Sequence, residues 1–302
     1  MIIRSDLPKL WEFLQPVIMK VYLKNSLALL VCVAWAQADV TISLFNQGAV
    51  ESDGVGDSQT FSYQSTKVKA DLLQQRFAMQ DNRDFSFYKI YADYSYTRLE
   101  WEPEQFELEN YGLGLTLGEI NNGKGRWSYL ANVHTALRQQ RGLSADFGNL
   151  RTTGFILGTY EVKQPWLGDS LAWSLGFAYL DMKDGEGVIP VAGFKWQVNP
   201  HWLLQSKSTT ISSHYSTCNV WTWKSIIERK HHVWDLNQGE LHWTAYHVGT
   251  GFTYQASDKL TTELLAGMSI GAEAEIEGAG AASRARDTDA GIWATLSLKY
   301  NY

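Results

Sequence analysis

Residues 171–179 read LAWSLGFAY and alternate at every position between a large apolar side chain and a small one. The large side chains are Leu171, Trp173, Leu175, Phe177 and Tyr179. Because successive side chains of a β-strand point to opposite faces, this period of two predicts a strand with one apolar side. In a soluble sheet the other side would meet water and would carry more charge than alanine, serine and glycine provide. The pattern therefore favours a membrane barrel over a soluble sandwich.

The same division recurs along the chain, in residues 111–118, 246–254 and 260–271. Aromatic residues gather near the ends of the alternating segments, as in Trp127/Tyr129 and Phe194/Trp196. Such rings are typical of the two lipid–water interfaces of a transmembrane barrel. The segment 291–302, GIWATLSLKYNY, alternates too and finishes on Tyr302. It resembles the terminal strand by which the barrel assembly machinery recognises outer-membrane barrels, so that machinery and outer-membrane lipid are the predicted partners.

The strand count follows from the alternation and from parity. Eleven strands are predicted, at about 61–76, 84–99, 108–119, 125–138, 151–162, 170–181, 187–198, 201–212, 241–256, 259–273 and 287–302. A closed antiparallel barrel with both termini on one side needs an even number. A twelfth strand near Val40–Gln47 supplies it, or ten remain if the N-terminal segments do not pair. The predicted fold is all-β: a closed antiparallel transmembrane barrel of about twelve strands, with residues 274–286 as an external loop.

The N-terminal region has the features of an export signal. From Met19 a basic stretch is followed by an apolar core, Leu27–Trp35, and by Ala36-Gln37-Ala38, a cleavage site of the A-x-A type. We predict a signal peptide at 1–38, with translation starting at Met19, a flexible periplasmic lead-in or plug at 39–59 and the barrel at 60–302. Lipidation at Cys32 is the competing interpretation, although Val31 fits a lipobox poorly.

Composition narrows the functional classes. Thirteen Trp, fifteen Tyr, twelve Phe and 25 Gly favour strands over helices. Removing residues 1–38 leaves 22 basic against 30 acidic residues, a net charge of −8, which disfavours nucleic-acid binding. No apolar run of about twenty residues follows residue 40, which excludes a helical membrane protein. Cys218 is then the one remaining cysteine, so no internal disulfide is expected.

Residues 205–235 interrupt the pattern. They contain Cys218, three of the seven histidines and four Lys/Arg, with poor alternation. A long surface loop is the first interpretation, and a local reading-frame error in the source gene is the alternative hypothesis. Just before this stretch, GVIPVAGFKWQVNPHWLLQ at 187–205 resembles a strand, Asn-Pro turn and strand unit of a family of bacterial outer-membrane barrels of unknown function. That resemblance covers residues 60–302 and implies a barrel without an assigned activity.

Candidate catalytic groups are few. His134 is predicted to face the lumen with Ser128, six residues away and too far for contact, and His242 and His247 have opposite strand parity. Neither His214, in Ser212-Ser213-His214, nor the pair His231-His232 with Glu228 forms a recognisable catalytic or metal motif. Asp53, Gly54, Gly56 and Asp57 lack the later glutamate of a calcium loop. No catalytic, metal or cofactor site is predicted.

The lumen decides the expected function. The predicted inward face is small, with Gly112, Gly114, Gly118, Ser174, Gly176, Ala178, Gly249, Gly251, Gly267, Ser269 and Gly271. These residues cannot close the interior, so either water or the lead-in Asp39–Gln59 is expected to fill it. Inward charges of both signs, Lys89, Asp93, Arg138, Glu263 and Lys299, predict weak ion selectivity. We expect a passive small-solute channel or a structural and interaction barrel of the bacterial outer membrane; the alternative is an outer-membrane enzyme such as a lipid-modifying hydrolase.

Overall fold

A computed structural model describes most of the chain after residue 38. The described residues are 39–52, 59–78, 84–101, 104–120, 126–144, 150–162, 168–182, 185–207, 209–237, 239–278, 281–288 and 290–302. The predicted export signal and the stretch Asp53–Asp57 lie outside them. The strands are β1 Val40–Ser52, β2 Gln59–Ala78, β3 Phe85–Trp101, β4 Glu104–Ile120, β5 Arg126–Gln140, β6 Leu150–Val162, β7 Ser170–Met182, β8 Gly185–Gln197, β9 Trp202–Lys207, β10 Thr210–Ser216, β11 Trp221–Leu236, β12 Gly239–Gln255, β13 Leu260–Gly278, β14 Ala281–Thr288 and β15 Gly291–Tyr300.

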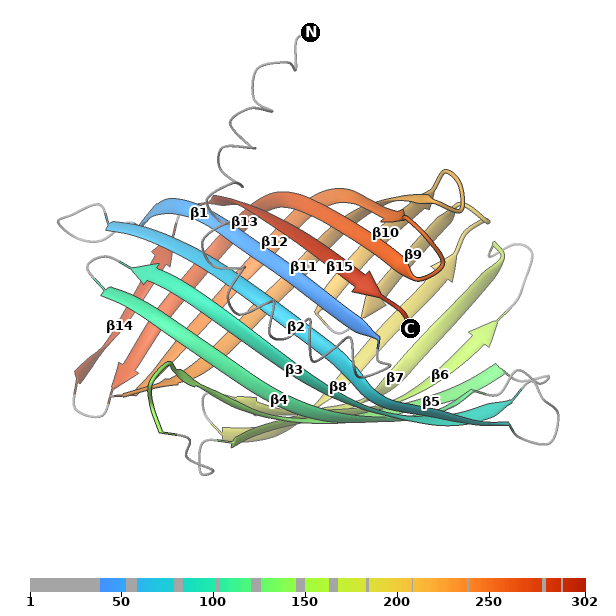
Figure 1. Ribbon diagram of the computed structural model, residues 1–302, viewed down its shortest axis with the longest axis horizontal. Helices are drawn as coiled ribbons and strands as arrows, with labels where there is room; N and C mark the ends of the chain where they lie inside the picture. Colours follow the sequence, from blue (N-terminus) through green and yellow to red (C-terminus); the bar gives the residue numbers. More distant parts are fainter. Residues whose placement is uncertain are drawn as a thin grey trace, which may run out of the picture. The chain divides into compact units, whose positions relative to one another are not determined.

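From β1 to β14 each strand pairs antiparallel with the next, and the sheet closes because β14 and β15 both pair with β1 (Figure 1). β14 and β15 share one place in the wall, since β14 pairs with Ala272–Gly278 of β13 and β15 with Leu260–Ser269 of the same strand. The barrel therefore has 14 strand positions. The predicted closed antiparallel all-β barrel is confirmed, and the predicted count of twelve, or ten, is wrong.

The two additional strands come from the irregular stretch. Residues 205–235 contain the end of β9, all of β10 and all but the last residue of β11, so the interpretation as a long surface loop is wrong. The predicted strand 201–212 is in fact β9 and the start of β10, joined by a tight hairpin with Lys207 opposite Thr210. The external loop expected at 274–286 is a hairpin between β13 and β14.

The predicted N-terminal strand is present and longer than expected. β1 pairs with β2 on one side and with β15 on the other, from Val40 onward. Residues 40–52 are thus part of the wall, so the interpretation of this segment as a flexible lead-in or plug is wrong. Deleting residues 39–59 would remove a strand rather than unblock a lumen.

The outward face is apolar. Leu175 is 69% exposed and Ile156 58%, and the large residues of LAWSLGFAY all point outward. Aromatic pairs form a ring at the terminal end of the barrel, where β1 begins and β15 finishes. They are Trp127–Tyr160 (4.7 Å between ring centroids), Trp173–Phe194 (6.2 Å), Trp202–Tyr215 (4.8 Å) and Trp221–Tyr254 (4.5 Å). An apolar band with an aromatic girdle is the surface of an outer-membrane barrel. No helix among the described residues is long and apolar enough to cross a membrane.

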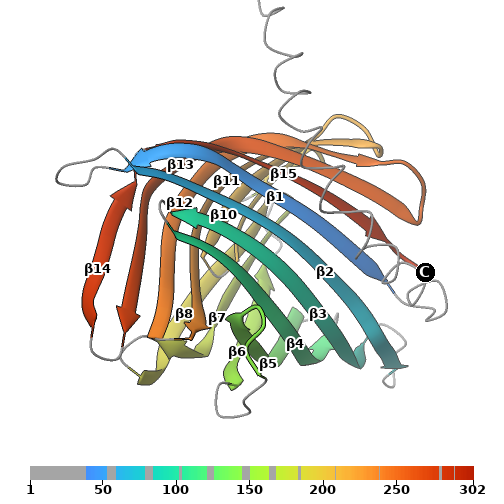
Figure 2. The same ribbon diagram turned by 60° about the vertical axis from the view of Figure 1, so that its left-hand side comes forward.

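The interior is filled on one side only. A cluster of buried apolar residues comes from β1–β4, β11–β13 and β15: Phe45, Phe61, Tyr63, Leu99, Trp101, Phe106, Leu108, Ile226, Trp234, Leu241, Trp243, Ala245, Leu265, Ala272, Ala274 and Trp293. We call this the filled half. None of its members comes from β5–β10. Figure 2 shows β6, β7 and β8 on the side of the barrel opposite β1.

Candidate functional site

The small inward residues are where the alternation predicted them, but on the filled half they leave no void. A side chain added at Gly114 would collide with the Tyr91 ring, and one added at Gly249 would collide with Trp293. Gly114 makes room for a ring from its direct partner on β3, whereas Gly249 makes room for a ring from β15, which reaches it across Gly267 of the intervening strand β13. The expectation that glycines on these strands open the lumen is therefore wrong.

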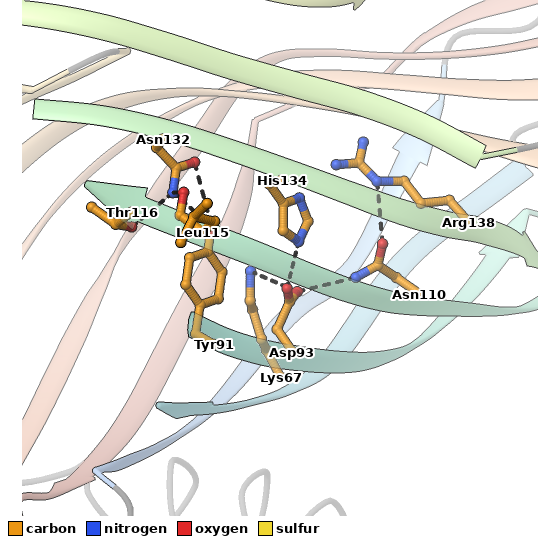
Figure 3. A network of polar contacts seen from close by, with 9 residues as sticks. All are labelled: Lys67, Tyr91, Asp93, Asn110, Leu115, Thr116, Asn132, His134 and Arg138. Carbon is orange, nitrogen blue, oxygen red and sulfur yellow. Dashed lines mark hydrogen bonds and ion pairs between the residues drawn. The ribbon is translucent and has the colours of Figure 1, made fainter. Parts of the chain in front are cut away.

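A polar network lines the wall next to the filled half, on β2–β5 (Figure 3). Asp93 is its centre: His134 Nε2 lies 2.6 Å from Asp93 Oδ1, the Asn110 amide donates to Asp93 Oδ2 at 3.2 Å, and Lys67 Nζ lies 3.6 Å from that same oxygen. Arg138 extends the network by donating to Asn110 Oδ1 at 3.2 Å. Buried carboxylates need such partners, since an unpaired charge in this position is costly.

A second part of the network lies toward the terminal end. The Asn132 amide donates to Tyr91 Oη at 3.1 Å and to Thr116 Oγ1 at 2.9 Å. The Tyr91 ring stacks on His134 at 5.8 Å, and Lys69 Nζ lies 3.6 Å above the same ring. These contacts fix the rings and charges of the wall. Within the described part of the chain, no serine, threonine or cysteine side chain hydrogen-bonds to Asp93 or His134.

His134 faces the lumen with Ser128, as predicted, and bonds Asp93 rather than Ser128. The alternation missed this partner because it identifies faces, whereas contact between neighbouring strands depends on register. Asp93 lies opposite Gly112, and Gly114 lies opposite His134, so one glycine-rich strand separates the two side chains. The glycines of β4 were the available signal, because a side chain there would separate the pair.

The other histidines are spread over both faces. His214 bonds Ser212 Oγ at 2.9 Å, but the Gln205 amide also lies 3.1 Å from the same His214 Nε2. His232 stacks on Trp243 at 5.6 Å inside the filled half, while His231 points outward and bonds Thr244 Oγ1 at 2.8 Å. The register thus separates the adjacent histidines to opposite faces. The described residues contain no group of three metal-ligating side chains.

His247 and His242 lie on opposite faces of β12, as the opposite parity of their positions predicted. His247 is buried in the filled half and stacks on Phe45 at 5.1 Å and on Trp293 at 5.2 Å. His242 lies 3.2 Å from a carboxylate oxygen of Glu240, near the end where β11 and β12 meet. Among the described residues, no hydrogen bond or ring contact joins either histidine to His134 or His214, so these histidines do not form one catalytic group.

The wall folds inward at the loop end, the end opposite the termini. Asp235 of β11 pairs in parallel with Gln139 of β5, and the backbone N–H of Asn237 donates to Gln140 Oε1 at 3.3 Å. Arg151 of β6 donates to Asp235 Oδ1 and to Glu240 Oε1, each at 2.6 Å. We call this group, Arg151 with Asp235 and Glu240, the latch. It connects strands that lie far apart around the barrel and narrows the loop end.

The inner faces of β5–β10 form the open half of the lumen. Near the loop end they carry apolar side chains in paired rows: Leu130, Leu157 and Val191, then Phe155, Ala178 and Ile189. Nearer the terminal end the rows are polar: Ser128, Thr159 and Ser174, then Lys195, Gln205 and Ser212. Most of these side chains remain half-exposed, unlike those of the filled half.

Comparisons with known proteins concern the fold alone. No family model matches the chain, and no curated protein matches it in sequence. Among solved structures, an outer-membrane channel from Pseudomonas putida F1 is similar at 9% identity, covering 87% of this chain and 94% of that one with a TM-score of 0.46. A FadL homologue from Pseudomonas aeruginosa gives 10% identity, 87% and 90% coverage and a TM-score of 0.44. The translocator domain of the autotransporter NalP from Neisseria meningitidis is similar at 9% identity, covering 92% of this chain and 95% of that one with a TM-score of 0.32. The chain folds as a closed β-barrel of 14 strand positions whose outward face has the apolar band of a transmembrane barrel.

Proposed function

We propose that this barrel is a passive channel that lets small solutes cross the outer membrane through the open half of the lumen. The observation that carries the proposal is the unequal filling of the interior. The apolar cluster comes from β1–β4, β11–β13 and β15, whereas the inner faces of β5–β10 contribute nothing to it and mostly stay half-exposed, with Ala136, Ala178 and Ser212 as buried exceptions. A barrel with a purely structural role has no need for an accessible strip along one side.

The two zones of the open half suit a solute with a modest apolar part. The apolar rows around Leu157 and Val191 would desolvate a hydrocarbon surface, and the polar rows around Thr159 and Ser174 would keep the passage wetted. Thr159 and Ser174 already bond each other, at 2.7 Å between their hydroxyl oxygens. Since Lys195 lies in the next row, anionic groups on the solute are tolerated there.

The test introduces one bulky residue on each side of the same wall. Ser174→Trp places an indole in the open half, and Ala192→Trp, on the neighbouring strand, places the same group in the outward band. We expect the purified barrel to conduct in planar bilayers, Ser174→Trp to lose most of that conductance, and Ala192→Trp to retain it. A silent wild-type barrel that folds and inserts would refute the channel and leave the structural or interaction role.

A further inference from the structure

The wall of the barrel is incomplete between the β9–β10 hairpin and the loop end. β8 pairs along its whole length with β7, from Gly185 to Gln197, but it pairs with β9 only over Phe194–Gln197. Among the described residues, the edge of Gly185–Gly193 that faces away from β7 has no strand partner. The cause is the shortness of β9 and β10, which span six and seven residues against thirteen in β8.

The other side of this break is β11. Its pairing with β10 stops at Glu228, where Arg229 donates its backbone N–H to the Thr209 carbonyl at 3.0 Å. Beyond that point β11 runs toward β5, which it reaches at Asp235. The β9–β10 hairpin therefore bounds, on the side of the terminal end, a break between β8 and β11. At the hairpin three strand spacings separate β8 from β11, roughly 14 Å in all.

The break lies at membrane depth. Val188 and Pro190 of the free edge point outward beside Tyr179 and Phe177 of β7, and Val188 is 66% exposed. These residues belong to the same apolar band as Leu175. Six residues, Val188–Gly193, give a free edge of roughly 20 Å at 3.3 Å per residue. The edge thus borders lipid on its outward face.

Pro190 is compatible with a strand edge that has no hydrogen-bonded partner. It lies opposite Phe177, and since proline has no N–H, the two residues cannot exchange backbone hydrogen bonds. Its nitrogen therefore points toward the free edge, where an ordinary residue would expose an N–H group. Proline is confined in sheets to such edges. Free backbone at membrane depth is tolerated where it lines a protein cavity, which matches a break that opens into the lumen.

A depression of about 540 Å³ marks the same place. It is lined by Leu175, Gly176, Phe177, Pro190, Val191 and Ala192, which belong to both faces of the sheet. Gly176 and Val191 are inward and part of the apolar rows of the open half, whereas the others are outward. The depression thus lies over the β7–β8 pair beside the free edge, and its lining includes Val191 of the open half as well as residues of the lipid-facing side.

We propose that this break is a lateral opening through which an apolar group, an aromatic ring or a hydrocarbon chain, passes between the open half of the lumen and the membrane. The inference rests on the proposed channel function and adds to it a route and a solute class. The latch narrows the loop end, and the opening gives an apolar solute an exit that avoids the polar rows near the terminal end.

The test measures contact with apolar quenchers at three positions. In a background where Cys32 and Cys218 are serine, single cysteines at Val191, Ala192 and Ala172 receive a bimane fluorophore, and the full barrel is reconstituted in lipid with brominated acyl chains. Ala192 is the outward control, and Ala172, inward on the fully paired strand β7, is the lumen control. We expect quenching at position 191 close to that at 192, and little at 172. A parallel sample in ordinary lipid with added bromobenzene distinguishes a free solute from a lipid chain.

The outcomes separate the two proposals. Quenching at 191 in either sample supports the opening, with the responding sample identifying the occupant, and quenching at 192 alone overturns it. If the barrel conducts but 191 is not quenched, the channel stands and the lateral opening falls. If 191 is quenched but no conductance is seen, the opening stands and the channel falls. Val191→Asp, which adds charge at the opening, is further expected to slow the transfer of bromobenzene into vesicles.

Discussion

The latch at the loop end gives a quantitative prediction about gating. In Arg151→Met the guanidinium is lost, while Asp235 and Glu240 remain as neighbouring carboxylates. Arg151 and Asp235 are 12% and 13% exposed, so the bond between them contributes about 1.5–3 kcal/mol. Glu240 is 37% exposed, and solvent screening limits its share to at most about 1 kcal/mol. The substitution should therefore destabilise the narrowed state of the loop end by roughly 2–4 kcal/mol of free energy relative to a wider state.

Because 1.4 kcal/mol is a factor of ten, this loss shifts the ratio of narrow to wide states by about 30-fold to several hundred-fold. Single-channel recording should show longer and larger openings in Arg151→Met than in the wild type. The matched control is Arg141→Met, which breaks an exposed ion pair with Glu107 at the same end. Such exposed pairs contribute about 0–1 kcal/mol, so its traces should match the wild type. If both variants fold and give identical traces, the latch does not control the width of the loop end.

Three further predictions concern folding and orientation. Trp243→Ala, which removes a fully buried indole stacked on Tyr63 at 4.5 Å, should lower the free energy of unfolding by about 3–5 kcal/mol in urea titrations; a loss under about 1 kcal/mol would contradict the packing described. Cys218 lies in the exposed turn between β10 and β11 at the terminal end, and hydrogen bonds from the Val220 and Trp221 backbone lower the pKa of its thiol. A large polyethylene-glycol maleimide should therefore label it rapidly at neutral pH, but only once the outer membrane of cells is permeabilised; labelling of intact cells would reverse the orientation. Deleting Tyr302 should reduce assembled, heat-modifiable barrel without reducing export, and unchanged outer-membrane levels would remove the terminal residue from the assembly signal.

The sequence predicts strands well where one face is apolar and the other small, as in β4, β7 and β12. It fails at β11 although the alternation is present there. Trp221, Trp223 and Ile227 point outward, and Lys224 and Glu228 point inward, with Glu228 opposite His247 of β12. Toward the loop end the outward positions of β11 become Arg229 and His231, because the strand leaves the apolar band. A mixture of charges on both faces then looks like a loop when the strand is considered alone.

The contents of the lumen could not be predicted for a different reason. Alternation shows that Gly249 and Gly267 face inward, and local reasoning reads an inward glycine as empty space. The structure places Trp293, from a strand later in the chain, over Gly249. Which ring covers which glycine depends on the register of paired strands and on closure between β1 and β15. Pro190 was a local signal that was available, since proline inside an alternating segment indicates a sheet edge.

Tyr91 and Gly114 are expected to evolve as a coupled pair. The tyrosine ring occupies the space that any side chain at position 114 would need, and it is held there by Asn132. A lineage could enlarge residue 114 only after residue 91 had shrunk, so the two positions should change together among relatives of this chain. The order of the changes is also constrained, because Gly114→Leu alone would expel the ring, whereas Tyr91→Ser alone leaves a tolerable gap. Divergence of the barrel interior would then proceed by paired exchanges across neighbouring strands, while the lipid-facing residues drift independently of one another.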